Sequence, residues 1–338
     1  MSRFLPTRSA LRRRDLIGLF AGGIAAFPKG AHAQQARKLH RIAILWHAGN
    51  AEEEGPYLEA VRLGFIDHGY VEGRTITFEH RFPNEEPERF RSMAAELAAL
   101  QPDVFLTAGG PASIAAKNAT ATIPVVFIVV PDPLGSNLVD SLARPGANVT
   151  GLANFAVQLS AKRLEFLKEA VPRLSRVALL INPNVKITSR YVEESETAAA
   201  KLGVALQRIE ARSIDDLKRA FDAMVKARAQ AVVVNAEGVF FQGRTIIARL
   251  ALERGLPTCV FSRETLEAGA FMSYGPDQRA IFRHAAVYAD KILKGAKPGD
   301  LPVEQPSRFE LLVNVRTAKA LRVTIPPSLQ PRVDHFIE

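Results

Sequence analysis

The sequence predicts an α/β protein made of two similar lobes, each a doubly wound parallel β-sheet with helices on both faces. Two observations predict this class. Short apolar runs rich in β-branched residues alternate with longer segments of helical periodicity along residues 41–261. The passages 101–127 and 229–261 also repeat one order of strand, helix and strand. Strands alternating with helices specify βαβ units, whose sheets are covered on both faces.

The first half supplies four strands and three helices. Residues 56–68 show the helical pattern clearly, because Val61 and Phe65 fall on one face and Gly69 ends the helix. The expected strands are 41–46, 75–79, 103–107 and 123–130, and the expected helices are 56–68, 87–100 and 111–119.

The second half begins near residue 160 and repeats the alternation. One helix opens with a capping box, Ser213-Ile-Asp-Asp216, in which a serine and an acid three residues later bond to the first turn. The expected helices are 160–171, 188–202, one starting at 213, and 243–254, and the expected strands are 176–181, 205–209, 231–235 and 258–261.

The last seventy residues extend this plan. They contain a strand at 269–274, a helix at 276–293 and extended chain at 304–315, too little for a third domain. These pieces must pack on the two lobes, so the chain crosses between lobes more than once, and several crossings make a hinge. We expect residues 39–151 with 269–297 in one lobe, and residues 152–268 with 298–328 in the other.

Residues 1–33 have the three parts of an export signal. A basic stretch ends at Arg12-Arg13-Arg14, an apolar run covers 16–27, and Ala31-His32-Ala33 predicts cleavage before Gln34. The pair Arg13-Arg14 indicates a twin-arginine signal, with an ordinary Sec signal as the alternative. Twelve apolar residues are too few to cross a membrane core of roughly 30 Å. The sequence therefore predicts a soluble, periplasmic protein.

The charge of the chain argues against a nucleic-acid partner. The net charge is +9, but without residues 1–33 the chain keeps 38 basic and 34 acidic residues, a net of +4. These charges are well mixed along the chain, which does not favour a dedicated nucleic-acid surface.

Motifs of enzymes and of metal or cofactor sites are missing from the sequence. There is no G-x-S-x-G, H-E-x-x-H, Walker or C-x-x-C motif, and no G-x-G-x-x-G fingerprint. We expect no cofactor, no metal and no enzyme, although a triad scattered along the chain stays open. The single cysteine, Cys259, lies in an apolar strand and is expected to be a buried thiol.

Several motifs in order along the chain resemble one family. They are Asp67-His-Gly-Tyr-Val-Glu-Gly73, 141–151 (SLARPGANVTG), 162–168 (KRLEFLK), 271–277 (FMSYGPD) and the closing stretch 292–311. The chain resembles ABC transporter substrate-binding proteins of the type that includes tryptophan binders. The resemblance implies a type I periplasmic-binding fold, with two Rossmann-like lobes joined by three crossovers. It does not fix the ligand.

In the first lobe, candidate ligand-binding residues are the loops that follow the strands, because ligands of open parallel sheets bind beyond the carboxyl ends of the strands. Gly109 and Gly110 let a ligand approach the backbone just before a helix that begins at Pro111, whose free N–H groups suit an anion such as a carboxylate, although a plain turn is the alternative. Other first-lobe candidates, with packing or capping as the alternative role, are Trp46, His47, Thr107, Ser113 and Asp132.

The second lobe offers candidates of the same kind. Adjacent phenylalanines at 240–241 either pack on the lobe or place one ring against a ligand. Arg263 either binds a carboxylate or pairs with Glu264. The full second-lobe set is Asn182, Glu237, Phe240, Arg263 and Tyr274.

We therefore expect a monomeric solute-binding protein whose lobes close on a small carboxylate-bearing molecule, such as an amino acid, and which then docks on an ABC permease in the inner membrane. Two alternatives stay open. One is a receptor that reports its ligand to a periplasmic sensor, and the other is an exported enzyme.

Overall fold

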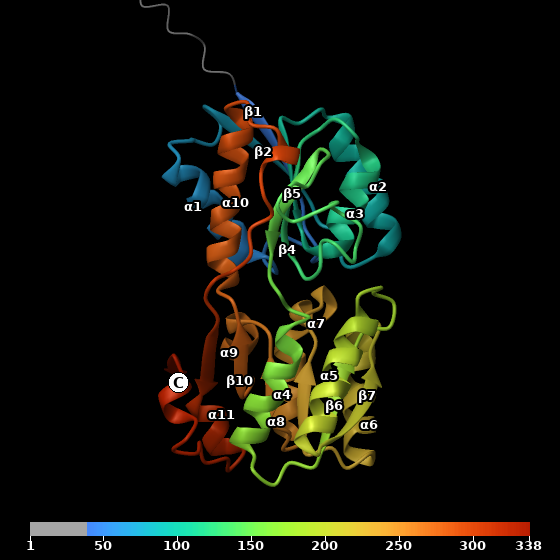
Figure 1. The fold of residues 1–338 in the computed structure, drawn as a ribbon, viewed down its shortest axis with the longest axis vertical. Helices are drawn as coiled ribbons and strands as arrows, with labels where there is room; N and C mark the ends of the chain where they lie inside the picture. The colour runs from blue at the N-terminus through green and yellow to red at the C-terminus, as the bar shows by residue number, and fades with distance from the viewer. Residues whose placement is uncertain (1–38) are drawn as a thin grey trace, which may run out of the picture. The chain divides into compact units, whose positions relative to one another are not determined.

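Two β-sheets organise the chain in a computed structural model that describes residues 39–338 (Figure 1). The expected α/β class with two parallel-sheet lobes is confirmed. The predicted export signal, residues 1–33, lies outside the described residues.

The first sheet has five strands in the order β2-β1-β3-β4-β5, all parallel. Apolar runs such as Val125-Val-Phe-Ile-Val-Val130 are almost wholly buried, as expected for strands covered on both faces. The strands are β1 (His40–Leu45), β2 (Ile76–Arg81), β3 (Val104–Ala108), β4 (Val125–Val130) and β5 (Val149–Ala153). Of these, β5 has no counterpart among the strands expected from the sequence.

Alternate residues of β1 show how the helices of this lobe cover the sheet. Ile42 and Ile44 pack with α1 (Gly55–Asp67), whereas Ala43 and Leu45 pack with α2 (Pro87–Ala99). The helix α3 (Gly109–Ala119) lies beside α2, and α10 (Gln278–Leu293) lies along α1 (Figure 1).

The second sheet has seven strands in the order β12-β11-β10-β9-β8-β6-β7, parallel except for the antiparallel pair β10–β11. Its strands are β6 (Arg176–Ile181), β7 (Ala205–Glu210), β8 (Ala231–Val234), β9 (Thr258–Val260), β10 (Met272–Gly275), β11 (Glu310–Asn314) and β12 (His335–Ile337).

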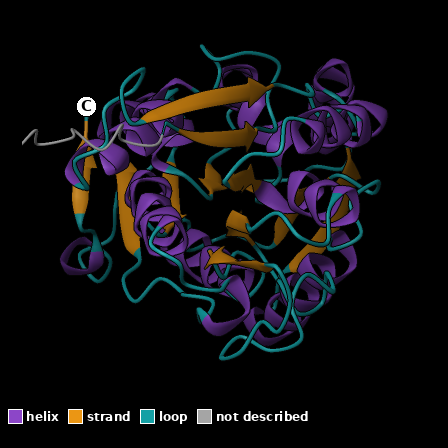
Figure 2. Ribbon diagram, turned by 90° about the horizontal axis from the view of Figure 1, so that it is seen from above, coloured by secondary structure: helices purple, strands orange, loops and turns teal. Residues whose placement is uncertain are grey.

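Helices cover both faces of this sheet too, and in the view of Figure 2 helices lie on either side of the central strands. Val177 and Leu179 of β6 pack toward α4 and α5, whereas Ala178 and Leu180 pack toward α6 and α8. The capping box expected at Ser213 is present. The helices are α4 (Leu159–Ala170), α5 (Thr188–Leu202), α6 (Leu217–Lys226), α7 (Gly238–Gln242), α8 (Arg244–Glu253), α9 (Arg263–Glu267) and α11 (Val315–Ala320), with 3-10 turns η1 (Ile214–Asp216), η2 (Pro298–Asp300) and η3 (Gln330–Arg332).

The tail divides between the lobes differently from the sequence-based assignment. The strand β10, expected in the first lobe, pairs with β9 and β11 in the second sheet. Residues 298–304, expected in the second lobe, lie on the first, where Glu304 bridges Leu152 and Val303 donates to the Leu142 carbonyl. A short strand goes where neighbouring strands can satisfy its backbone groups, and the strand's own sequence does not identify those neighbours.

The chain crosses between the sheets after β5, after β10 and again before β11. Arg163 of α4, which is fully buried, ties two of these crossings together. Its guanidinium donates to the Tyr274 carbonyl at 2.9 Å and to the Ala156 carbonyl at 3.2 Å. These two crossings therefore share one buried arginine as a common anchor.

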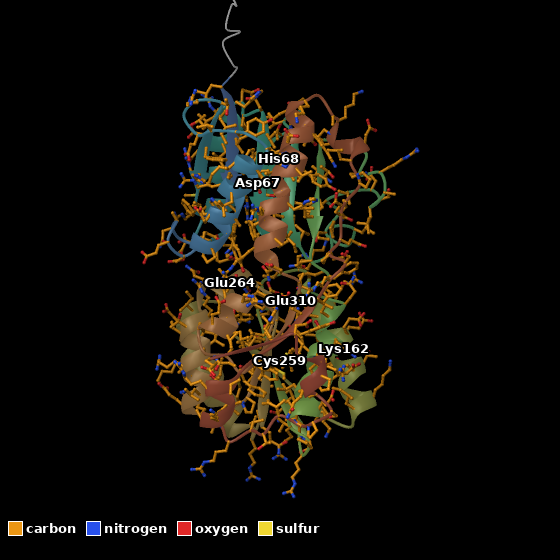
Figure 3. All side chains as sticks on the ribbon, turned by 90° about the vertical axis from the view of Figure 1, so that its left-hand side faces the viewer. Asp67, His68, Lys162, Cys259, Glu264 and Glu310 are labelled. Carbon is orange, nitrogen blue, oxygen red and sulfur yellow. The ribbon has the colours of Figure 1, made fainter. Side chains whose placement is uncertain are left out.

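Cys259 lies in β9 within the second lobe (Figure 3), and its thiol is buried, as the sequence predicted. Burial raises the pKa of this thiol to about 12, so it stays protonated and unreactive at neutral pH.

Candidate functional site

A cavity of about 1050 Å³ lies where the carboxyl ends of strands from both sheets converge. His47 and Gly109 follow strands of the first sheet, and Asn182 and Glu237 follow strands of the second. Ligands of parallel α/β sheets bind at this edge, so the fold itself places the cavity.

The first turn of α3 forms one wall of the cavity. Gly109 has φ of +82°, a left-handed conformation that glycine adopts without strain. A Cβ added to Gly110 would meet no atom within 4 Å, so the backbone here borders open space. Unpaired N–H groups at the start of this eleven-residue helix carry partial positive charge and suit an anionic group.

Two hydroxyl groups hold this loop in shape. Ser113 donates to the Gly109 carbonyl at 2.5 Å and lies 2.9 Å from the Thr107 hydroxyl. Both side chains are fully buried beneath the loop rather than in the cavity lining.

His47 lies at the cavity between two carboxylates. Its ring nitrogens are 3.5 Å from Glu54 and 3.2 Å from Glu85. Burial by itself lowers the pKa of His47, but attraction to Glu54 and Glu85 outweighs burial and raises the pKa to about 9. The imidazole is therefore a cation at neutral pH. Glu54 also accepts the backbone N–H groups of His47 and Ala48.

Glu237 forms the facing wall in the second lobe. Its side chain is buried, and Thr188 donates to it at 3.3 Å. Burial and then repulsion from Glu85 raise the pKa of Glu237 to about 8. At neutral pH this carboxyl group is mostly protonated.

Aromatic rings supply the apolar part of the cavity. Tyr57 stacks on Phe282 at 4.4 Å and on Phe241 at 5.0 Å between ring centroids. All three residues line the cavity, so a flat apolar group can pack against them.

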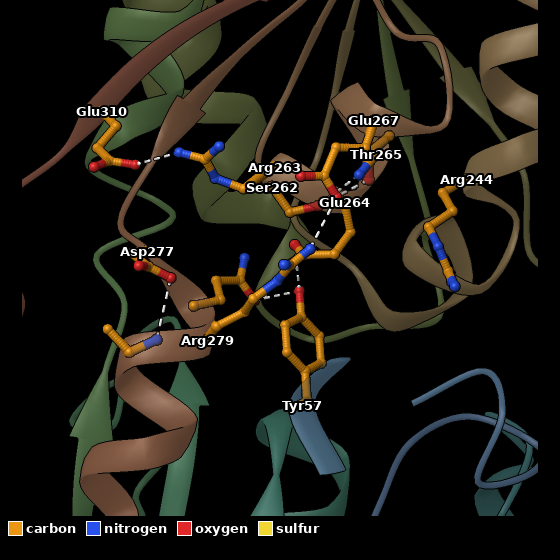
Figure 4. Close-up of polar contacts among 12 residues, drawn as sticks. Tyr57, Arg244, Ser262, Arg263, Glu264, Thr265, Glu267, Asp277, Arg279 and Glu310 are labelled. Atoms are coloured by element: carbon orange, nitrogen blue, oxygen red, sulfur yellow. Dashed lines mark hydrogen bonds and ion pairs between the residues drawn. The ribbon is translucent and has the colours of Figure 1, made fainter. Parts of the chain in front are cut away.

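Polar contacts behind the aromatic rings join the two lobes (Figure 4). The Tyr57 hydroxyl of α1 donates to Glu264 of α9 at 2.9 Å, and Arg279 at the start of α10 pairs with the same carboxylate at 2.7 Å. Glu264 is buried and thus anchors both first-lobe helices to the second lobe.

Further contacts between the lobes lie at the sides of the cavity. Gln242 donates to Asn84 at 2.7 Å and to Glu53 at 3.0 Å, and Arg190 pairs with Asp132. Asp132 also accepts the Gly135 N–H, so it has the capping role that was the alternative for this residue.

The structure brings five of the twelve predicted site residues to the cavity lining: His47, Gly109, Gly110, Asn182 and Glu237. The other seven lie outside that lining. Thr107 and Ser113 support the glycine loop, and Asp132 is held by Arg190.

The aromatic residues among these seven have packing roles. Trp46 is buried among His80, Phe82 and Phe282, and its indole N–H donates to His80. Phe240 faces the core, and the next residue, Phe241, takes the cavity position. Because 238–242 is the helix α7 and not a loop, neighbouring side chains point in different directions.

Arg263 and Tyr274 also lie away from the cavity. Arg263 pairs with Glu310 of β11 at 3.1 Å, not with Glu264, and Tyr274 packs against Phe166. Both residues lie beside β11, where Arg263 pairs with Glu310 and Tyr274 is paired with Leu311 in the sheet.

The candidates chosen from the sequence leave out other lining residues, among them Tyr57, Glu85, Arg190 and Phe282. Glu85 follows the end of β2, so the strand-end rule already pointed to it. Tyr57 and Arg190 sit in the first turns of helices, where nothing in the sequence marks a cavity-facing side chain.

Among residues 39–338, no helix is long and apolar enough to cross a membrane. In the same range, no three His, Cys, Asp or Glu side chains are grouped to hold a metal ion.

Two facing parallel-sheet lobes with a cavity at their strand ends define a binding protein of the type I periplasmic fold. The family model for the ABC transporter substrate binding protein matches residues 53–336, and the chain belongs to this family. Members of this family bind solutes and are not enzymes.

Individual relatives agree with this assignment. The chain is 26% identical over 273 residues to the tyrosine-binding protein of Clostridioides difficile, covering 79% of this chain and 78% of the relative. A conserved domain protein of Vibrio cholerae has a TM-score of 0.83 at 26% identity, covering 89% and 100% of the two chains. The ABC domain from Streptococcus pneumonia in complex with L-Trp has a TM-score of 0.81 at 23% identity, with the same coverage, and it supports the fold.

Proposed function

We propose that this protein is the solute-binding component of an ABC importer and that it binds an amino acid with an aromatic side chain. The observation that supports this most is the cavity lined by strand ends of both lobes, with an anion-binding helix start and three aromatic rings. An aromatic amino acid combines a carboxylate, which suits the helix start, with a flat ring, which suits the aromatic side chains.

In this proposal the ligand carboxylate lies at the start of α3, beside Gly109 and Gly110. The side chain packs against Tyr57, Phe241 and Phe282. The name of the C. difficile relative, a tyrosine-binding protein, supports an aromatic amino acid as the ligand.

The leader predicted at residues 1–33 supports export to the periplasm, with Arg13-Arg14 favouring the twin-arginine route. There the loaded protein, acting as a monomer, docks on the membrane permease of its transporter.

The test is a thermal-shift screen of the chain from Gln34, which retains every described residue, against amino acids, other carboxylates, sugars and purines. A ligand at 100 times its dissociation constant adds roughly 2.7 kcal/mol of stability, an easily measured shift. Aromatic amino acids should give saturable shifts and be recovered unaltered. Chemical turnover of the bound molecule would favour the enzyme alternative instead.

A pair of glycine variants tests the placement of the carboxylate. Gly110→Leu puts a side chain into the open space at the start of α3 and should abolish binding while the protein stays folded. Gly55→Leu is the matched control, because Gly55 also starts a helix, has no atom within 4 Å of an added Cβ, and lies outside the cavity lining. Unchanged affinity in Gly110→Leu contradicts the placement.

A further inference from the structure

Two carboxylates from opposite lobes meet at the cavity. Glu85 follows β2 in the first lobe, and Glu237 follows β8 in the second. The Glu85 carboxylate lies so close to Gly238, the neighbour of Glu237, that a Cβ on Gly238 would collide with it. Repulsion from Glu85 acts on Glu237 directly. A carboxylate of the first lobe therefore lies against the turn of the second lobe that carries Glu237.

The positive charge of His47 is already paired with carboxylates of the first lobe. The cationic ring of His47 lies between Glu54 and Glu85, so one cation serves two carboxylates there. Glu237 receives only the neutral Thr188 hydroxyl, and the Tyr191 ring behind it brings no positive charge. Glu237 thus has no cationic partner among the described residues.

Arginines at or near the cavity have other partners. Arg190 pairs with Asp132, Arg212 with Glu210 at 2.7 Å and Arg91 with Glu88 at 3.1 Å. Arg244 stacks on the Phe241 ring and donates to the Phe241 and Glu53 carbonyls. Lys186, also in the lining, is exposed in the turn before α5. Among the described residues, none of these cations forms an ion pair with Glu237, so this carboxyl group is without a cationic partner.

We infer that the ligand supplies this cation: its ammonium group lies between Glu85 and Glu237, joins the two lobes, and displaces a proton from Glu237 to solvent. This inference rests on the proposed function and assigns the specificity for a zwitterion to these two residues. Before binding, one proton on the Glu237 carboxyl group relieves the repulsion. On binding, that O–H bond breaks, the proton leaves to buffer, and the ammonium keeps all of its own hydrogens.

The raised pKa of Glu237, about 8, agrees with a protonated empty state at neutral pH. Binding at pH 7 should then release about one proton per ligand, because a carboxyl group that is mostly protonated becomes ionised. Affinity should rise with pH until Glu237 is ionised in the empty protein.

Calorimetry at pH 7 in phosphate and in Tris measures the released protons from the difference in binding heat. The probes are L-tyrosine and L-tryptophan, each compared with its acid lacking the amino group, 3-(4-hydroxyphenyl)propanoate and 3-indolepropionate. We expect proton release with both amino acids, and affinities for the two acids weaker by about 10- to 100-fold, the value of a hydrogen bond between charged groups.

Glu237→Gln should weaken amino-acid binding by a similar factor and remove the proton release, since the amide has the size of the protonated acid but does not ionise. Glu85→Gln is a second variant that should weaken binding without abolishing the release. The control is Glu253→Gln, in an exposed pair with Arg249 on α8, far from the cavity lining.

Each outcome decides one statement. Equal affinity for the amino acids and their deaminated acids, or unchanged proton release in Glu237→Gln, overturns the ammonium site and leaves the binding function standing. If folded protein binds neither these amino acids nor any other amino acid, the proposed function fails and the ammonium site fails with it.

Discussion

We call the first-lobe wall of the cavity balanced, because both of its carboxylates, Glu54 and Glu85, have a cationic partner, and the second-lobe wall unbalanced, because Glu237 has none among the described residues. In the first lobe, His47 is held between Glu54 and Glu85, and Glu54 also accepts two backbone N–H groups. In the second lobe, Glu237 is buried with one hydroxyl donor. A buried charge is stable only with a partner, so the first wall is complete when empty and the second is completed by a proton or a ligand.

The largest loss of stability should come from removing the cation of the balanced wall. His47→Ala leaves Glu54 and Glu85 without their cation in a buried site, and such a loss costs about 3–5 kcal/mol. Urea unfolding at pH 7 measures it. His284→Ala is the matched control, because His284 also pairs with a glutamate but is exposed, where a pair contributes at most about 1 kcal/mol. Equal losses in the two variants would mean that the His47 cluster is not a balanced buried group.

The unbalanced wall predicts that the stability of the empty protein depends on pH. The folded protein raises the pKa of Glu237 to about 8, so its contribution to stability is full below the unfolded value near 4.5 and is lost as the pH rises through 8. Glu237→Gln does not titrate, and it should be more stable than the wild type above pH 8.

Each unit of pKa shift corresponds to about 1.4 kcal/mol, so a gain of roughly 2–4 kcal/mol is expected at pH 9 after partial relaxation of the site. Urea unfolding of the empty protein at pH 5 and pH 9 checks it. A gain that is the same at both pH values contradicts the raised pKa.

A smaller effect should follow from loosening the contact that joins the walls. Tyr57→Phe keeps the stacked ring but leaves Glu264 without its tyrosine donor, at a cost of about 1–3 kcal/mol. Tyr70→Phe is the control, because its hydroxyl donates to Asp290 within the first lobe and lies outside the cavity. Both variants should lose stability in urea, but only Tyr57→Phe should also change amino-acid affinity. Unchanged affinity in Tyr57→Phe would mean that the hydrogen bond between Tyr57 and Glu264 does not affect ligand binding.

The smallest effect is expected at the rim. The pair Arg190–Asp132 joins the lobes, but the arginine is half exposed, so Arg190→Ala should cost at most about 1 kcal/mol and less in high salt. Urea unfolding at low and high salt measures it, with Arg249→Ala as an exposed pair within one lobe. A loss that persists at 1 M salt would place Arg190 among the buried groups.

Much of the fold was predictable because each element carries its own pattern. The helix Thr188–Leu202 has the predicted bounds, and most strands agree within one or two residues. The strand β5 was missed, because its sequence, Val-Thr-Gly-Leu-Ala, contains a glycine and small residues that do not read as a strand by themselves. The helices α7 and α9 were taken as loops because each has only five residues, too few for a helical pattern to show.

The site was predictable in position but not in its members. The strand-end rule pointed to His47, Gly109, Gly110, Asn182 and Glu237, all of which line the cavity. It also pointed to Trp46, which is buried because its side chain turns to the core where three rings pack around it. Choosing Phe241 over Phe240 would have required knowing that the segment is helical, which rotates neighbouring side chains apart.

By itself, the sequence determined the two-lobed α/β class, the family resemblance and the edge of each sheet where a ligand would lie. These follow from local periodicity and chain order, which each segment carries alone. Only the tertiary structure decided which sheet receives β10 and that Glu85 faces Glu237 across the lobes. The first outcome depends on backbone pairing with β9 and β11, and the second on electrostatic interaction between residues more than 150 positions apart, and no local pattern records either.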